Sequence, residues 1–258
     1  MTPEGRVHVT TRGPVATIRF DRPTARNAMT WAMYDALDAA LDRIAEDDSL
    51  RVLVLRGTGS HFVAGTDISQ FATFRTGKDG VAYEKRLDAT IARIDDLRLA
   101  TVAAIQGYAV GGGFALATAC DLRLCTPDAQ FGVPIARTVG NCLSMSNLAR
   151  LVAHLGAGRT RHLLFTAEFL TAAEAHASGF ILPPVDPRAF DSSLARLCAR
   201  LAEHAPITLQ VTRTALTRII ATMTPKGDDL VRRAYASRDF REGVKAFVEK
   251  RPPMWQGE

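Results

Sequence analysis

A chain of 258 residues with 47% hydrophobic side chains is long enough to bury one sizeable core, and this composition is typical of a soluble globular protein. The net charge of +5 is modest, the basic residues are scattered along the chain, and aromatic residues make up only 7%, which argues against nucleic-acid binding. No uninterrupted apolar stretch approaches the roughly 18 residues of a membrane-spanning helix, so the sequence predicts no membrane protein.

The cysteines and the N-terminal segment predict the cellular compartment. The four cysteines show no metal-binding spacing such as C-x-x-C, which predicts reduced thiols and no metal site. Met1–Val9 lacks the apolar core of a signal peptide and passes directly into a strand pattern. Together these features predict a cytoplasmic protein.

The first part of the chain alternates strands and helices. Val15–Phe20 alternates apolar and polar residues, as a half-exposed strand does. Val52–Leu55 predicts the next strand and leads into a turn at Phe62–Ile68. Thr30 is placed to cap the helix between these strands, because apolar side chains recur after it at helical spacing, at Met33, Leu37, Leu41 and Ile44.

A break is expected after this turn. Gly77–Gly80 contains two glycines, a lysine and an aspartate. Such a composition predicts a loop, followed by a helix over Val81–Leu97. Because exposed loops are mobile and often functional, we interpret Gly77–Gly80 as a mobile segment over a site.

The most informative segment is the glycine-rich turn at Gly107–Gly113. It follows the apolar strand Thr101–Ile105 and opens the small-residue helix Phe114–Ala119, so a buried strand leads into a helix N-terminus. Three consecutive glycines remove every Cβ, and a ligand can approach the free N–H groups at the positive end of the helix. With the turn at Phe62–Ile68, two backbone amides become available for one oxygen atom, which predicts an oxyanion hole.

The rest of the chain begins with short strands and ends in helices. Asp121–Cys125 and Ala129–Gly132 read as strands, and Asp121 itself is expected to fix backbone N–H groups. Thr171–Glu174 predicts a capping box that opens a helix ending at Gly179. Three further helices are expected, over Pro187–His204, Pro206–Thr222 and Asp228–Phe240. We therefore divide the chain into a core over residues 1–190 and a C-terminal helical region over residues 191–258.

These motifs, in this order, resemble one known family. Besides the two turns, the matching segments are Arg22-Pro23, Asn27-Ala28, Ala129–Gly132 and Phe247–Arg251. From residue 6 to residue 251, the chain is similar to the crotonase superfamily of enoyl-CoA hydratases and isomerases. The resemblance implies an α/β fold, in which a crotonase-like spiral of ββα units forms the core and a helical layer follows at the C-terminus.

The resemblance also implies a ligand and an assembly. The substrate is expected to be a coenzyme A thioester, whose phosphates suit a protein of positive net charge, with no cofactor bound permanently. The C-terminal helical layer is expected to serve oligomerisation and to cover a neighbouring subunit in a homotrimer or a dimer of trimers.

Carried over residue by residue, the resemblance assigns the oxyanion hole to the backbone amides of Thr66 and Gly112. The two catalytic glutamates of the family's hydratases correspond to Ala115 and Ile135 in this chain. Both acid/base carboxylates are therefore expected to be absent, and the usual hydration chemistry with them.

Asn141 and Cys142 lie nearest to the place where some family members carry a third acidic residue, and we predict that they take part in catalysis. A neutral asparagine donates and accepts hydrogen bonds but is no general base. Cys142 would be a nucleophile only if its surroundings lowered its pKa. The alternative is that Asn141 makes turn contacts and Cys142 merely packs, and both interpretations stand at this stage.

The resemblance further predicts the residues that contact the coenzyme A and the acyl group. Asp67 has the alternative role of positioning its loop, Lys250 that of a solvated charge at a helix end, and Arg137 is a candidate partner for a substrate carboxylate. The complete predicted set is Ala25, Arg26, Ala64, Asp67, Ile68, Gly111, Ile135, Arg137, Phe247 and Lys250.

Two functions are consistent with these residues. The first is an acyl-CoA enzyme that stabilises a thioester enolate in the oxyanion hole and transfers protons with groups unusual for the family. The second is a catalytically silent acyl-CoA-binding or assembly subunit. An intact hole favours the enzyme, because a mere binder gains little from stabilising an enolate.

Overall fold

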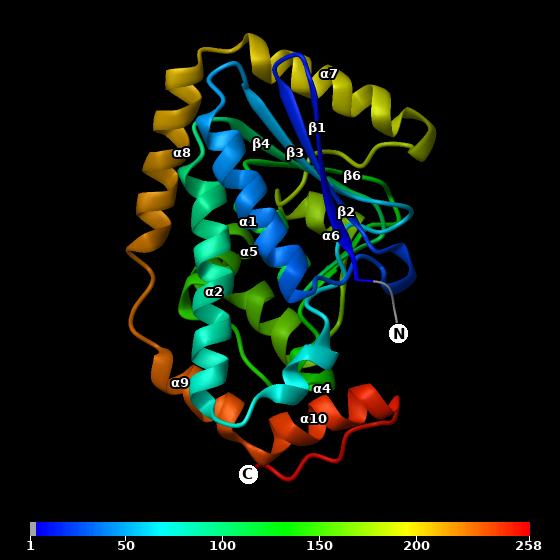
Figure 1. Ribbon diagram of the computed structural model, residues 1–258, viewed down its shortest axis with the longest axis vertical. Helices are drawn as coiled ribbons and strands as arrows, with labels where there is room; N and C mark the ends of the chain where they lie inside the picture. The colour runs from blue at the N-terminus through cyan, green and yellow to red at the C-terminus, as the bar shows by residue number, and fades with distance from the viewer. Residues whose placement is uncertain (1–3) are drawn as a thin grey trace.

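The computed structural model describes residues 4–258 and contains two β-sheets (Figure 1). In the larger sheet, of order β1-β2-β3-β4-β6, β1 is antiparallel to β2 and the other neighbours are parallel; the smaller sheet has the order β5-β7-β8. The predicted α/β class is confirmed, while Met1–Pro3 of the segment expected to lead into the first strand lies outside the described residues.

The strands are β1 (Arg6–Arg12), β2 (Val15–Asp21), β3 (Val52–Gly57), β4 (Ala100–Ile105), β5 (Tyr108–Val110), β6 (Leu122–Cys125), β7 (Gln130–Gly132) and β8 (Leu170–Thr171).

The central strand β3 is buried on both faces. Leu53 and Leu55 belong to the main core, whereas Val52 and Val54 belong to a second buried cluster that includes Leu194 of α7. Successive side chains of a strand point to opposite faces of the sheet. The continuous apolar run that predicted this strand is therefore explained by a layer of core on each side.

The predicted helix N-caps at Thr30 and Thr171 are both confirmed. Thr30 Oγ1 accepts from the Met33 amide at 3.2 Å. Thr171 and Glu174 form the reciprocal capping box, in which the Thr171 amide donates to the Glu174 carboxylate at 2.9 Å. The helices are α1 (Trp31–Glu46), α2 (Gly77–Asp96), α3 (Gly112–Ala119), α4 (Ile135–Thr138), α5 (Met145–Thr166), α6 (Ala172–Ala177), α7 (Phe190–Glu203), α8 (Pro206–Ala221), α9 (Asp228–Ala236) and α10 (Arg238–Glu249), with short 3₁₀ helices η1 (Pro23–Ala25), η2 (Ile68–Thr73) and η3 (Pro187–Ala189).

The predicted loop at Gly77–Gly80 is wrong, because these four residues form the first turn of α2. Both glycines are buried where α9 packs against α2. A Cβ on Gly77 would collide with Arg232, and a Cβ on Gly80 would collide with the ring of Tyr235. The glycines therefore serve the close approach of two helices, and this segment is not a mobile cover.

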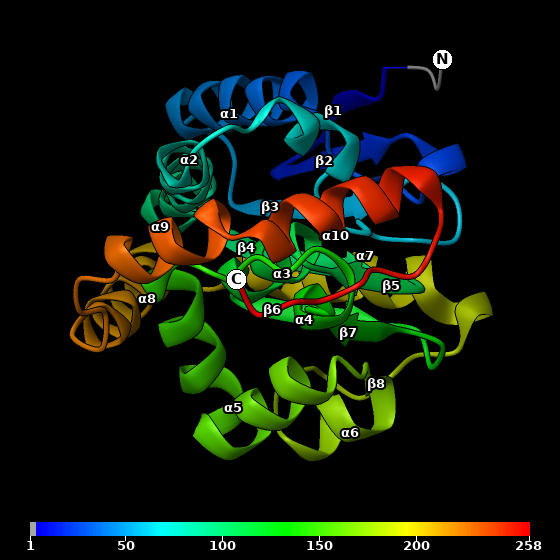
Figure 2. The same ribbon diagram turned by 90° about the horizontal axis from the view of Figure 1, so that it is seen from below.

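The C-terminal helices wrap around their own chain (Figures 1 and 2). α7 lies across the large sheet, α8 runs along one edge of the molecule, and α9 and α10 return to pack against α2 and η2. The single helix predicted over Asp228–Phe240 is wrong. Ser237 has an extended backbone (φ −65°, ψ 156°) that ends α9, and its hydroxyl accepts from the Phe240 amide at 2.9 Å to cap α10.

One buried arginine attaches α8 to the sheet. Arg213 is the buried residue of α8. Its Nε donates to Asp121 Oδ1 at 2.7 Å, and its terminal nitrogens donate to the carbonyls of Leu97 and Leu99. Asp121 in turn accepts from the Thr101 amide at 2.7 Å, which confirms the prediction that it fixes backbone N–H groups.

The outer face of α8 is apolar and exposed. Within residues 4–258, no helix combines the length and the apolar character that crossing a bilayer requires. A surface helix normally turns its apolar side chains toward the core, whereas several apolar side chains of α8 are exposed. The exposed side chains on it are Ile207, Val211, Leu216 and Ile219.

Candidate functional site

The two turns predicted to form a site lie side by side. The Val63 amide donates to the Tyr108 carbonyl at 3.1 Å, and the Val110 amide donates to the Val63 carbonyl at 3.0 Å. A Cβ on Gly113 would collide with the Val63 carbonyl. Glycine at this position therefore allows the turn after β3 to pack against the start of α3.

This packing brings the backbone amides of Thr66 and Gly112 close together. On either side of Thr66, the Gly65 carbonyl and the Asp67 amide are both hydrogen-bonded to Met29 at 2.8 Å. Gly112 is the first residue of α3, where helical N–H groups have no partner in the helix. A Cβ on Gly112 would lie 3.8 Å from the Thr66 nitrogen. No group among the described residues accepts from either amide, so both are free to donate to a ligand.

The Thr66 side chain is buried between two tyrosines. Its Oγ1 lies 2.8 Å from the Tyr34 hydroxyl of α1 and 2.8 Å from the Tyr83 hydroxyl of α2. Burial raises the pKa of Tyr34 to about 12 and raises the pKa of Tyr83 well above its ordinary value, so both phenols stay protonated at neutral pH. Sequence reasoning missed both tyrosines, since nothing in their spacing indicates that α1 and α2 converge on Thr66.

Asn141 lies between α4 and α5 and binds a second polar cluster. Its Nδ2 donates to the Tyr235 hydroxyl at 2.8 Å, and that hydroxyl donates to Glu84 at 2.6 Å. Glu84, the residue after Tyr83, also accepts from the Ser144 amide at 3.0 Å. Asn141 Oδ1 is buried and has no partner in residues 4–258. The rings of Tyr83 and Tyr235 are 6.3 Å apart, so Asn141 reaches the tyrosines beside Thr66 only through Tyr235.

Cys142 is half-buried against the main core. Burial, aided by the nearby charge of Glu84, raises the pKa of Cys142 to about 12. Because the thiolate is the nucleophilic form, this environment argues against a nucleophilic Cys142 and supports the interpretation that the side chain packs.

Glu84 is expected to make the stability of the fold depend on pH. Burial raises the pKa of its carboxyl from 4.5 to about 7. The folded state therefore holds the proton more tightly than the unfolded state, and the resulting stability is complete below pH 4.5 and lost as the pH rises through about 7. The free energy of unfolding should fall by on the order of 3 kcal/mol across this window. Urea unfolding measures this free energy at pH 5 and at pH 8. Between these two pH values, it should fall less in Glu84→Gln than in the wild type.

An exposed carboxyl provides the control for this measurement. Glu46→Gln at the end of α1 removes a solvent-exposed carboxylate and should leave the pH dependence unchanged. Identical pH profiles for the wild type and Glu84→Gln would contradict a buried, tightly held proton at Glu84.

The residues predicted for the nucleotide end lie around the first turn. The Ala64 amide donates to the Arg26 carbonyl at 3.0 Å. Arg26 directly follows Ala25, the last residue of η1. The Arg26 guanidinium lies 5.2 Å from the ring centre of Tyr108, as in a cation–π contact. Gly111 donates its amide to a carbonyl of β7 and is thereby oriented before α3.

The remaining predicted contacts differ in exposure. Asp67 forms an ion pair with Arg22 at 2.8 Å and accepts from the Ser69 amide at 3.0 Å, which agrees with a loop-positioning role. The half-buried Ile68 and Ile135 open η2 and α4, whereas Arg137, Phe247 and Lys250 are exposed.

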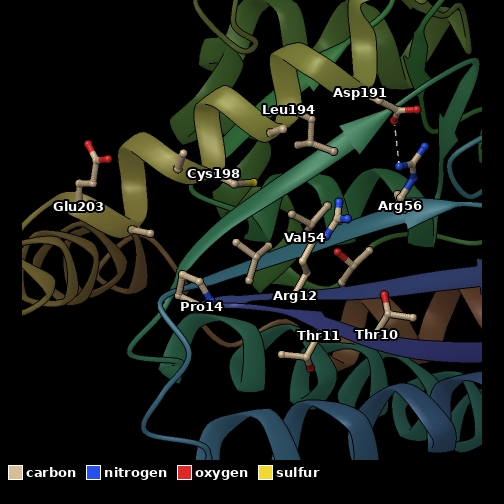
Figure 3. A pocket seen from close by; sticks show the side chains of 15 residues that line it. Thr10, Thr11, Arg12, Pro14, Val54, Arg56, Asp191, Leu194, Cys198 and Glu203 are labelled. Carbon is tan, nitrogen blue, oxygen red and sulfur yellow. Dashed lines mark hydrogen bonds and ion pairs between the residues drawn. The ribbon is translucent and has the colours of Figure 1, made fainter.

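A groove of about 850 Å³ lies elsewhere, between α7 and the first strands of the large sheet (Figure 3). Its walls include Val54 from β3 and Leu194 and Cys198 from α7. Arg56 and Asp191 form an ion pair at 3.0 Å at its edge, so these charges already satisfy each other. None of the predicted site residues lines this groove, so the groove and the predicted site are separate parts of the molecule.

Comparison with known proteins identifies the family. The sequence model of the enoyl-CoA hydratase/isomerase family matches residues 10–258. The chain therefore belongs to the enoyl-CoA hydratase/isomerase family, and the family resemblance predicted from its motifs is confirmed.

The relatives extend over almost the whole chain. The "Probable enoyl-CoA hydratase echA6" of Mycobacterium tuberculosis is 35% identical over 254 residues, which are 97% of this chain and 99% of the relative. The "Short-chain-enoyl-CoA hydratase" of Clostridium acetobutylicum is 28% identical over 247 residues, 93% of each chain. A solved structure of methylmalonyl-CoA decarboxylase in complex with 2-nitronate-propionyl-CoA is 25% identical, covers 98% of both chains and has a TM-score of 0.88. The predicted crotonase fold is thus confirmed as well.

Proposed function

We propose that this protein is an acyl-CoA-processing enzyme that holds the thioester carbonyl oxygen between the amides of Thr66 and Gly112 and stabilises the enolate formed there. One observation carries the proposal: each of two adjacent turns presents a backbone amide that has no acceptor within the described residues. Preorganised donors stabilise developing negative charge, by about 3–4 kcal/mol for a single donor when its removal is measured.

The proton-transfer groups of this enzyme would be unusual for its family. The positions that correspond to the two family glutamates hold Ala115 and Ile135. Decarboxylation of a carboxylated acyl group needs enolate stabilisation but no base at the α-carbon, because departing CO₂ leaves its electron pair there. The similarity to methylmalonyl-CoA decarboxylase supports testing this reaction beside isomerisation and hydration.

Coenzyme A would be bound through the surface around the first turn. Ala25, Arg26 and Ala64 would supply the contacts expected near its nucleotide. Phe247 and Lys250 would supply the contacts expected from the C-terminal part of the chain. The exposed apolar face of α8 supports a homotrimer or a dimer of trimers, with residues 191–258 serving assembly around a core over residues 1–190.

A catalytically silent acyl-CoA-binding or assembly subunit is the second candidate, and Ala115 and Ile135 are the observation that favours it. Calorimetry with a panel of acyl-CoAs, followed by mass spectrometry of the incubated mixtures, separates the two functions. An enzyme yields a product of changed mass, whereas a silent subunit binds and returns its ligand intact. Failure to bind any of several acyl-CoAs would contradict both candidates.

Asn141→Ala is expected to lower turnover at least tenfold, about 1.4 kcal/mol in the activation barrier, with little change in acyl-CoA affinity. The physical reason is loss of the amide that binds Tyr235 and of the buried, unpartnered Oδ1. Steady-state kinetics and calorimetry on the same preparations check both parts. Cys142→Ala is the comparison: its thiol is not ionised, so full activity is expected. The opposite pattern, an active Asn141→Ala and an inactive Cys142→Ala, would assign the chemistry to the thiol.

A further inference from the structure

We propose that the Tyr34 hydroxyl is a third donor to the substrate oxygen, beside the amides of Thr66 and Gly112. This inference rests on the proposed function, since it concerns the oxygen that the two amides would hold. It assigns to an α1 side chain a catalytic role that neither the family resemblance nor the motifs of the two turns indicate.

The hydroxyl groups around Thr66 carry one more hydrogen atom than their mutual hydrogen bonds use. Tyr34, Thr66 and Tyr83 contribute three hydroxyl hydrogens, and they are joined by two hydrogen bonds, both centred on Thr66 Oγ1. Each bond uses one hydrogen, and one hydroxyl hydrogen therefore remains. No other group in the described part of the chain accepts from these three hydroxyls, so this hydrogen is available to an acceptor outside the protein.

Of the three hydroxyls, that of Tyr34 lies nearest to Gly112. A Cβ on Gly112 would lie 2.5 Å from the Tyr34 oxygen and 3.2 Å from Thr66 Oγ1, and Tyr83 is not among its nearest neighbours. Tyr34 is therefore the end of the chain that adjoins Gly112. We therefore assign these hydrogen bonds the direction Tyr83 to Thr66 to Tyr34, in which each hydroxyl donates to the next and Tyr34 donates to the ligand.

The buried position of Tyr34 favours binding of a negatively charged oxygen. Tyr34 is only 2% exposed, and a donor in such a dry site interacts more strongly with an anion than the same donor in water. Burial raises the pKa of Tyr34 to about 12, so the phenol remains a neutral donor throughout the physiological range. A thioester enolate carries far more negative charge on its oxygen than the neutral thioester does. Tyr34 would therefore stabilise the enolate more than the bound substrate.

The experiment compares two ligands in calorimetry: propionyl-CoA, which is neutral at the acyl end, and 2-nitronate-propionyl-CoA, which carries an enolate-like negative charge. The wild type should bind the nitronate more tightly. Tyr34→Phe should lose about 10- to 100-fold in nitronate affinity, the effect of removing a hydrogen bond to a charged group. The affinity of Tyr34→Phe for propionyl-CoA should change less than about threefold.

Tyr83→Phe is the matched control, because it removes the same atom from a buried tyrosine that contacts the same threonine. Without Tyr83, Thr66 still donates to Tyr34, and Tyr34 still donates to the ligand, so the nitronate preference should persist. Equal losses in the two variants, or an unchanged preference in Tyr34→Phe, would overturn the role of Tyr34. Wild-type protein that binds neither ligand would overturn the proposed function itself, and the two failures are thus distinguishable.

If the Tyr34→Phe variant does not fold, a measurement on the wild type alone still tests the proposal. Addition of the nitronate, but not of propionyl-CoA, should produce a strongly deshielded tyrosine hydroxyl proton in the NMR spectrum. Absence of that signal from a saturated nitronate complex would overturn the proposal.

Discussion

Crotonyl-CoA is expected to be hydrated by this protein at least about 10²-fold more slowly than by a family member that carries both glutamates. Each general acid or base contributes roughly 10²–10⁴-fold to such a reaction. The family resemblance aligns Ala115 and Ile135 with the two glutamates, and neither of these side chains can transfer a proton. The enolate-stabilising amides would remain, so binding of crotonyl-CoA should persist while its hydration is nearly lost.

The loss of enoyl-thioester absorbance measures this directly, with the short-chain-enoyl-CoA hydratase of Clostridium acetobutylicum as the reference under the same conditions. Ala115→Glu with Ile135→Glu restores both carboxylates and should raise the rate if the rest of the site is intact. Turnover of crotonyl-CoA by the unaltered protein at the rate of the reference enzyme would contradict the inferred absence of acid/base groups.

Arg213→Met is expected to destabilise the fold by about 2–3 kcal/mol, less than the loss of one partner from a fully buried ion pair, because Asp121 is partly exposed. The substitution keeps most of the apolar stem but leaves Asp121 without its partner and two carbonyls, those of Leu97 and Leu99, without their donor. Because Arg213 is the buried residue of α8, this helix should detach from the sheet first.

Urea unfolding provides the free energy, and hydrogen exchange along α8 tests where the structure opens. Arg218→Met removes an exposed arginine from the same helix and should change the stability by less than about 0.5 kcal/mol. If Arg213→Met had the same free energy of unfolding as the wild type, α8 would be held by contacts other than this arginine.

The sequence predicted those parts of the fold that depend on neighbouring residues. The strands at Val52–Leu55 and Thr101–Ile105 follow from apolar runs, and the caps at Thr30 and Thr171 follow from side chains that bond within one turn of helix.

What could not be predicted depends on residues that meet from distant parts of the chain. Gly77 and Gly80 look like a loop because the helix that packs on them, α9, lies about 150 residues later, and isolated glycines usually disfavour helix. Tyr34 and Tyr83 have the spacing of ordinary core residues on two helices. Their hydroxyls matter only because α1 and α2 bring them to the same threonine.

The return of α9 onto α2 has a consequence for mixed assemblies. Tyr34, Thr66, Tyr83, Glu84 and Tyr235 all come from one polypeptide, because α9 packs on the α2 helix of its own chain. Two differently inactivated copies, one altered at Tyr34 and one at Asn141, would therefore not rescue each other when combined in one oligomer. If either altered copy were combined with intact chains instead, activity would rise in direct proportion to the fraction of intact chains, as it does for catalytic units that work independently.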